Sequence, residues 1–247
     1  MMPLRIRVFG MIQVGIVGER IMPVSNYTDE QRDLLRELLD AGAILTGPVI
    51  RERFGLNSPI YLDLREQLYA RPALLWKVGR EFARKIAEMG APSGLPQFVV
   101  GIPDTATPLA LATALYAWQN HAQPPITYAM LRKEAKIYPG LPPRYSIASG
   151  APGDYNLIDD VVASGQTKRA AISRLESEGI TVRRIIVLFD RQQGDGLRRE
   201  GFEPHGIFKV AEVLDFYLSE GRISRDDHDR IIHFLNSRRF DSSPLLK

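Results

Sequence analysis

Two adjacent carboxylates, Asp159 and Asp160, follow an apolar run and precede small residues and Gly165. Residues 155–167 therefore predict a buried strand, then the acids, then a turn into a helix. Open α/β sheets bind ligands at the carboxyl edge of their strands, and a helix that begins there presents unpaired N–H groups to an anion. Acids beside an anion site suit a ligand that carries both phosphate and ribose hydroxyls, with or without Mg²⁺. An ordinary strand, turn and helix with exposed acids is the alternative.

The helix predicted after this turn has two faces. Its apolar face consists of Ala171, Ile172 and Leu175, and its polar face of Lys168, Arg169 and Arg174. We expect the polar face to be exposed to solvent. The turn matches neither G-x-x-x-x-G-K-[ST] nor G-x-G-x-x-G, so neither of these two common nucleotide-binding loops is predicted here.

A second group of charged residues, Arg132, Lys133 and Lys136, follows an apolar strand predicted over residues 126–131. Three cations at a strand end are usual for a solvated edge. The next residues include Pro139, Gly140, Pro142 and Pro143. They predict a long mobile loop that runs to about Gly153, and long loops in compact domains are often functional lids.

Two more strands are predicted to end beside polar residues. Residues 98–101 lead into a loop with Asp104 and Thr105, and Thr107 can cap a helix that begins at Pro108. Such a loop can offer backbone N–H groups to a diphosphate or can simply join the strand to the helix. The last clear strand, residues 182–189, ends beside Arg191.

The remaining elements predict packing. Thr28 and Gln31 form a capping box before a leucine stripe, and a second apolar stripe follows Pro72. Two helices close the chain, the second with Ser224 as its cap. We expect residues 1–25 to hold an extra strand or a loosely packed extension.

Composition narrows the function classes. The chain has 247 residues with 45% hydrophobic residues and no cysteine, which excludes disulfides and thiolate catalysis. A net charge of +3 is too small to predict a nucleic-acid partner, and no segment approaches the roughly 20 apolar residues that span a membrane. The four histidines lack ligand spacing, so we predict no metal site made of side chains alone. We expect a cytoplasmic enzyme.

The acidic turn resembles the phosphoribosyl-diphosphate loop of type I phosphoribosyltransferases. Earlier in the chain, "SPIYLDLR" before Arg71-Pro72, "GIPDTATPLA", and "RKEAK" followed by a tyrosine and a glycine are similar to segments of the orotate phosphoribosyltransferases. Five blocks occur in that family's order between about residues 30 and 220. The resemblance implies an α/β fold with a central, mostly parallel sheet flanked by helices. It also implies an extension (1–25), a small hood (26–70) and a core with C-terminal helices (71–247).

The resemblance further implies Mg²⁺-dependent transfer of ribose 5-phosphate from phosphoribosyl diphosphate (PRPP) to orotate, in a homodimer with shared active sites. Lys136 would lie on a lid, and Asp159 and Asp160 would fix the ribose, so these three are the predicted catalytic residues. The predicted substrate-binding residues are Arg53, Tyr61, Leu62, Asp104, Thr105, Arg132, Lys133, Tyr138, Val161, Val162, Ala163, Ser164, Gly165, Gln166, Thr167 and Arg191. Mg²⁺ would bind through substrate oxygens, with Asp159 or Asp160 as a further ligand.

Four residues depart from the family pattern. Asp104 stands where tyrosine is common, Ile137 replaces a usual acid, Ala163 replaces threonine, and Gln166 replaces a small residue. Two alternatives therefore stay open. One is a related transferase that acts on another base, and the other is a non-catalytic protein that binds PRPP as a regulator.

Overall fold

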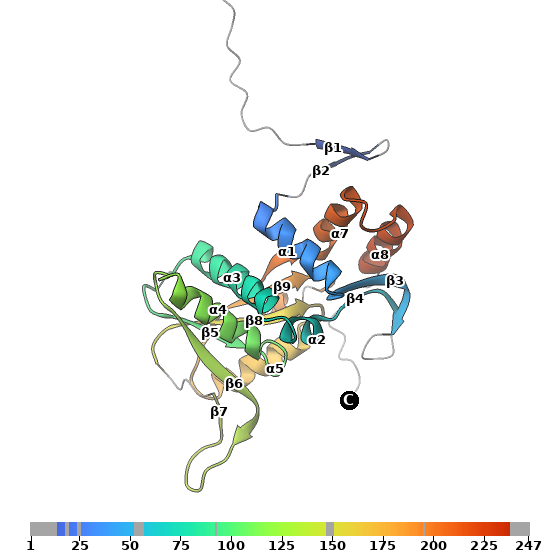
Figure 1. Cartoon of the computed structure of the whole chain (residues 1–247). Helices are drawn as coiled ribbons and strands as arrows, with labels where there is room; N and C mark the ends of the chain where they lie inside the picture. Colours follow the sequence, from blue (N-terminus) through green and yellow to red (C-terminus); the bar gives the residue numbers. More distant parts are fainter. Residues whose placement is uncertain are drawn as a thin grey trace, which may run out of the picture.

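The computed structural model describes residues 14–17, 20–23, 26–51, 57–91, 93–146, 151–194 and 196–237. Its centre is a six-stranded sheet in the order β10-β9-β8-β5-β6-β7 (Figure 1). The strands are β5 (Gln97–Gly101), β6 (Ile126–Lys136), β7 (Arg144–Ser146), β8 (Asp154–Val162), β9 (Val182–Asp190) and β10 (Pro204–Lys209). Neighbouring strands from β10 to β6 are parallel, and only β7 is antiparallel. The predicted mostly parallel α/β sheet is confirmed.

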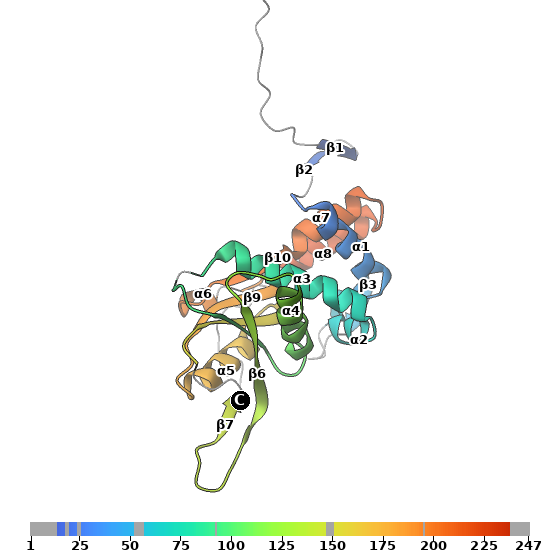
Figure 2. The same ribbon diagram turned by 60° about the vertical axis from the view of Figure 1, so that its left-hand side comes forward.

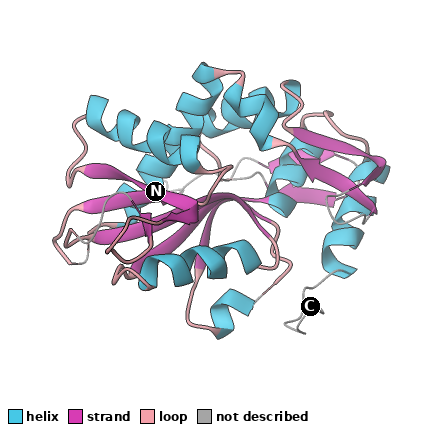
Figure 3. Ribbon diagram, turned by 90° about the horizontal axis from the view of Figure 1, so that it is seen from below, coloured by secondary structure: helices cyan, strands magenta, loops and turns pink. Residues whose placement is uncertain are grey.

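Helices cover both faces of this sheet (Figure 3). On one face α3 (Pro72–Met89) packs against α4 (Thr107–Gln119), and on the other α5 (Gln166–Glu176) packs against β9. The stripe predicted after Pro72 is largely buried in α3, because Val78, Phe82 and Ile86 face the core. A short helix, α6 (Gly196–Arg199), follows β9.

Two strands outside the sheet, β3 (Ile44–Arg51) and β4 (Asn57–Leu62), pair antiparallel. They lead into α2 (Leu64–Tyr69). Contacts with β3 and β4 come from the far end of the chain, where α8 (Arg225–Ser237) packs against both strands. We call β3, β4, α2 and α8 the hood layer. A separate antiparallel hairpin joins β1 (Val14–Val17) to β2 (Arg20–Pro23).

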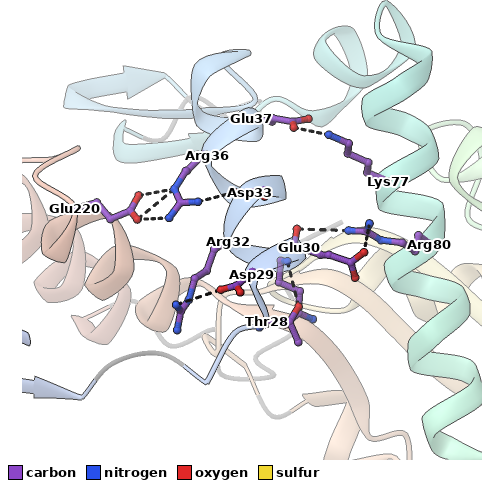
Figure 4. A network of polar contacts seen from close by, with 11 residues as sticks. Thr28, Asp29, Glu30, Arg32, Asp33, Arg36, Glu37, Lys77, Arg80 and Glu220 are labelled. Atoms are coloured by element: carbon purple, nitrogen blue, oxygen red, sulfur yellow. Dashed lines mark hydrogen bonds and ion pairs between the residues drawn. The ribbon is translucent and has the colours of Figure 1, made fainter. Parts of the chain in front are cut away.

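Helix α1 (Asp29–Asp40) links the core to the C-terminal helix α7 (Val210–Ser219) (Figure 4). The capping box of Thr28 and Gln31 is confirmed. On one side Arg36 forms an ion pair with Glu220 at 2.5 Å, and the buried Tyr217 hydroxyl donates to the Leu35 carbonyl at 2.6 Å.

On its other side α1 forms ion pairs with α3. Arg80 lies 3.2 Å from Glu30, and Lys77 pairs with Glu37 (Figure 4). Exposed pairs contribute at most about 1 kcal/mol each, whereas the buried leucines of α1 contribute roughly 1.5–3 kcal/mol each. Apolar packing therefore fixes α1, and the ion pairs add orientation.

Three predictions about the elements need correction. Strand β6 continues through Lys136, and β7 pairs with it where a loop was expected, because the two segments satisfy each other's backbone groups. The N-cap of α4 is Ala106, so Thr107 is already helical. Strand β10 adds a sheet edge after the strand predicted to be last. Ser224 does cap α8, since its hydroxyl accepts from the Asp227 N–H at 3.1 Å.

Candidate active site

Three loops meet at the carboxyl edge of the sheet. In the register of the strands Val162 lies opposite Asp190, so β8 and β9 end side by side, and their neighbour β5 ends at Gly101, opposite Ile158 of β8. Backbone bonds join the loops themselves, because the Arg191 N–H donates to the Val162 carbonyl at 3.2 Å. The residues that sequence reasoning placed after these strands therefore share one edge.

The acidic pair lies within the last part of β8. Both oxygens of Asp159 are used inside the chain: Oδ2 is 2.5 Å from Lys168 Nζ, and Oδ1 accepts the Asp160 N–H at 3.0 Å. Asp160 Oδ1 accepts the Val161 N–H at 2.8 Å. Burial and the neighbouring Asp159 carboxylate raise the pKa of Asp160 to about 7, against the opposing effect of Lys168. The pair is an electronegative centre with one charge already compensated.

Lys168 corrects the sequence prediction of a solvent-exposed polar face. It is only 4% exposed, because its ammonium turns inward to Asp159 and also donates to the Val161 carbonyl. The polar-face rule fails here because it assigns every lysine to water, whereas a lysine can be buried when a carboxylate compensates its charge.

The turn after β8 leads into the start of α5, and we call residues 163–167 the anion cradle, because the N-terminus of a helix suits an anion. Gly165 caps α5 at φ +77°, and a Cβ there would lie 2.5 Å from the Leu197 side chain, so only glycine fits. The first hydrogen bond within the helix runs from the Arg169 N–H to the Gly165 carbonyl. The backbone N–H groups before Arg169 therefore have no acceptor within the helix and can donate to a ligand. Arg169 also donates to the Ser164 carbonyl at 3.2 Å, which supports the turn from behind.

The loop after β5, residues 102–106, folds tightly onto its strand. A Cβ on Gly101 would lie 2.1 Å from the Ala106 carbonyl oxygen, so the turn requires glycine. Thr105 is buried, while Asp104 points outward and lies 3.8 Å from Lys133 of β6. The ion pair shows that this loop and the cations of β6 are neighbours.

Tyr69 is a residue of this site that sequence reasoning missed. It ends α2 in the hood layer, is 42% exposed, and its hydroxyl donates to the Thr105 carbonyl. Burial raises the pKa of Tyr69 to about 12, and the carboxylates of Asp160 and Asp104 add to the effect. Tyr69 thus lies near both loops. No spacing rule indicates it, because its partner is 36 residues away.

The lid residues lie on a two-stranded ribbon, β6 and β7, that projects from the body of the molecule (Figures 1 and 2). Lys136 is opposite Arg144 in the register, and its ammonium lies 4.8 Å from the Tyr138 ring centroid. A pocket of about 180 Å³ on the ribbon is lined by Arg132, Lys136, Tyr138, Arg144 and Ser146. Its three cations suit a polyanion. Arg144 was missed because strand pairing, rather than sequence spacing, brings it there.

The loop after β9 faces the hood layer. The Arg191 guanidinium lies 6.0 Å from the Phe234 ring centroid of α8. Gln193 is 1% exposed, and neither polar atom of its side chain has a hydrogen-bond partner in the described part of the chain. Tyr61 and Leu62 are half-buried on β4. Arg53 lies outside the described residues.

Two findings concern metals and membranes. No group of three or more histidine, aspartate or glutamate side chains could hold a metal ion within residues the structure describes. The same part of the chain contains no helix with the length and apolar character to cross a bilayer.

Known proteins are similar to this chain over most of its length. Orotate phosphoribosyltransferase of Chlamydia caviae is 30% identical over 196 residues, which is 75% of this chain and 85% of that protein. The Pseudomonas fluorescens enzyme of the same name is 31% identical over 202 residues, 77% of this chain and 89% of that protein. Uridine 5'-monophosphate synthase of Bos taurus is 32% identical over 87% of this chain. The match covers only 44% of the length of that protein. No protein-family model matches the chain.

Solved structures share the fold. UMP synthase of Leishmania donovani superposes with a TM-score of 0.66 at 26% identity, over 84% of this chain and 42% of that one. Orotate phosphoribosyltransferase of Francisella tularensis gives a TM-score of 0.64 at 15% identity, over 83% and 98%. The predicted type I phosphoribosyltransferase fold is therefore confirmed. With bacterial relatives at 30% identity or more matched over most of their length, the chain belongs to the orotate phosphoribosyltransferase family.

Proposed function

We propose that this chain transfers ribose 5-phosphate from PRPP to orotate, which yields orotidine 5′-phosphate and diphosphate in pyrimidine biosynthesis. The observation that carries the proposal is the meeting of the acidic pair, the anion cradle and the loops after β5 and β9 at one sheet edge, in a chain of this family.

The chemistry needs charge stabilisation more than a nucleophile. Breaking the bond from ribose C1 to diphosphate builds positive charge on the sugar and negative charge on the leaving group. The cations of β6, Arg132, Lys133 and Lys136, are proposed to stabilise the leaving diphosphate. Closure of the ribbon would exclude water, which competes with the base as acceptor. A chain without cysteine is compatible with direct transfer.

The remaining parts of PRPP are assigned by charge. The acidic pair is proposed to accept hydrogen bonds from the ribose hydroxyls, and the backbone of residues 163–167 to bind the 5-phosphate. Val161 and Val162 hold the acidic pair at the end of β8. The loop with Asp104 and Thr105 faces the diphosphate.

The base is proposed to lie between the hood layer and the loop after β9. Arg191 suits the orotate carboxylate because a guanidinium can donate two parallel bonds. Tyr61 and Leu62 offer a wall for the flat ring, and Arg53 is proposed as a further phosphate contact.

Mg²⁺ fits the residues present. The carboxylates of Asp159 and Asp160 are adjacent at the end of β8, and within the described residues a lysine pairs with Asp159 but not with Asp160. Mg²⁺ commonly binds one or two carboxylates together with substrate phosphates, so one carboxylate of the acidic pair and the ligand oxygens would hold it. When bound, the ion supplies positive charge to the diphosphate. The proposal predicts that chelation abolishes turnover and that Mg²⁺ restores it.

The chain is proposed to act as a homodimer whose ribbon reaches the partner's site. Leu111, Leu115 and Trp118 of α4 are exposed at helical spacing, and Trp118 is 76% exposed. Ile137 on the ribbon is likewise 76% exposed. Apolar side chains gathered in this way favour a protein partner. Sedimentation velocity of the purified chain tests the stoichiometry.

We propose a cytoplasmic location, because PRPP is a polyanion that does not cross membranes unaided. Fractionation of source cells tests it.

The decisive assay follows orotate absorbance with PRPP and Mg²⁺ and identifies the product by chromatography. Failure of pure protein to form orotidine 5′-phosphate would overturn the orotate assignment. Ala163 favours one second candidate, transfer to another base, because the usual threonine hydroxyl is missing beside the substrate. A panel of bases in the same assay decides between them, and PRPP binding without any transfer would indicate a regulator.

A further inference from the structure

Lys168 is a buried cation in the first turn of α5, where its charge is least expected. It is the third residue of the helix, so its ammonium lies near the positive end of the helix dipole. Its side chain is 5% exposed and that of Asp159 is 7% exposed. Both the dipole and burial oppose a lysine here, and the Asp159 carboxylate is the charge that compensates it.

The contacts of Lys168 all lie at the end of β8 and the start of α5. Nζ is 2.5 Å from Asp159 Oδ2, donates to the Val161 carbonyl, and lies 3.5 Å from Thr167 Oγ1. The lysine therefore joins the strand that carries the acidic pair to the helix that forms the anion cradle. Any shift of Asp159 toward a ligand would break this contact.

The two acids are consequently unequal. Each oxygen of Asp159 already has a partner in the chain, from Lys168 and from the Asp160 N–H. In the described part of the chain no lysine or arginine forms an ion pair with Asp160. Asp160 is also less buried than Asp159.

We infer that Lys168 is a positioning residue of the ribose-phosphate site: it holds Asp159 inside the protein, so that Asp160 alone offers a carboxylate to the ligand. The inference rests on the proposed function and divides the roles of the two acids. Lys168 touches no substrate in this account. It acts through Asp159 by cancelling a negative charge beside the cradle that binds the 5-phosphate.

Lys168→Met tests the inference because it removes the charge and keeps much of the side-chain volume. Asp159 then carries an uncompensated charge next to the cradle and repels PRPP. We expect its Kd, measured by calorimetry with Mg²⁺ and no base, to rise at least about tenfold. In the assay the KM for PRPP should rise while the KM for orotate stays within about twofold of wild type. A purely structural lysine would instead lower the active fraction, and so kcat, with both KM values unchanged.

The double variant Lys168→Met/Asp159→Asn removes both charges of the pair. We expect it to recover PRPP affinity to within about fivefold of wild type, because the repelling charge is gone. Asp160→Asn should weaken PRPP binding, and Lys168→Met should not rescue it. Lys85→Met is the matched control, since Lys85 is remote in sequence from the site and pairs with Glu88, three residues on in the same helix, at 3.5 Å.

Three results would overturn the inference: wild-type affinity in Lys168→Met, a double variant as weak as Lys168→Met, or rescue of Asp160→Asn by Lys168→Met. If Lys168→Met does not fold, the double variant is compared with Asp160→Asn, and weaker PRPP binding by the double variant counts against the inference. Wild-type protein that binds no PRPP would overturn the proposed function and this inference together. PRPP binding without orotidylate formation would remove only the orotate assignment.

Discussion

The anion cradle and the ribbon both suit an anion, the cradle through the N-terminus of a helix and the ribbon through its cations. They differ in how firmly the rest of the chain holds them. The cradle is held from several sides: Gly165 packs against Leu197, Arg169 donates to the Ser164 carbonyl, and Lys168 fixes Asp159. The ribbon is held near its base, where Glu178 accepts from the Ser146 N–H at 3.0 Å. Toward its tip Ile137 and Leu141 are exposed.

This contrast teaches which step each surface serves. A cradle that is ordered before the ligand arrives contributes to affinity, because little ordering remains to be done on binding. A projecting ribbon gains its contacts only when it closes over a ligand or meets a partner, so its cations act in the closed, reacting state. Changes in the cradle should therefore alter PRPP affinity, and changes in the ribbon should alter kcat.

The largest expected effect comes from Lys136 and tests whether the ribbon acts in the reacting state. Lys136→Ala should lower kcat on the order of 100-fold, because it removes a cation from the developing charge of the leaving group. The Kd for PRPP should change by less than about threefold. Steady-state kinetics and calorimetry measure the two values, with Lys85→Ala as the control for loss of a surface lysine. A large loss of affinity with normal kcat would contradict the assignment of the ribbon to the reacting state.

Gly165→Ala tests whether the shape of the anion cradle determines PRPP affinity. The new Cβ clashes with Leu197, and alanine at this position must adopt a positive φ, a strain of about 1–3 kcal/mol. Because relief of this strain would shift the cradle, PRPP affinity should fall about 10- to 30-fold. Gly179→Ala is the matched control, because Gly179 has φ +76° and no atom within 4 Å of its Cβ position. It should lose only stability. Equal losses of PRPP affinity in both variants would mean that backbone strain alone, and not the cradle, is responsible.

Leu115→Arg tests whether the ribbon depends on a second copy of the chain. The charge lies in the middle of the exposed face of α4, so we expect a monomer in sedimentation velocity and a fall in kcat of about tenfold. Leu95→Arg is the control, since Leu95 is exposed in the loop before β5 and lies outside α4. A monomeric variant with full kcat would show that the ribbon closes within its own subunit.

Ala163→Thr sharpens the contrast, since it should improve the cradle without touching the ribbon. The added hydroxyl can supply one more hydrogen bond, worth about 1 kcal/mol, which is about a fivefold lower KM for orotate. The same variant assayed with the base panel reports whether the gain is specific to orotate. Ala163→Val, similar in shape and without a hydroxyl, controls for size.

Tyr69→Phe should give the smallest change. It removes the hydroxyl that ties α2 to the Thr105 carbonyl and keeps the ring. The free energy of unfolding should fall by about 0.5–1.5 kcal/mol, with a loss in kcat/KM of about threefold or less. Urea denaturation and the orotate assay measure both, and Tyr61→Phe serves as a control within the hood layer.

The sequence predicted what local rules decide. The buried strand and the following helix of residues 155–167, and the capping box at Thr28, follow from neighbours within a few residues, and all are present. The acidic pair was expected after the strand but lies within it, because β8 continues through Val162. Lys168 could not be placed correctly, because its burial depends on a carboxylate nine residues away on another element. Arg144 and Tyr69 reach the site through strand pairing and hood packing. The roles of the predicted site residues remain predictions.

The packing of α8 on β3 and β4 has a consequence for how the chain folds. The two strands come early in synthesis and the helix that covers them comes much later, and the Tyr217–Leu35 bond spans 182 residues. Contacts between such distant segments slow folding, because most of the chain must be ordered before they form. The hood layer is thus completed only when residues 225–237 have been synthesised. The wall proposed for the base, Tyr61 and Leu62 of β4, is therefore expected to gain its final packing after the anion cradle has formed.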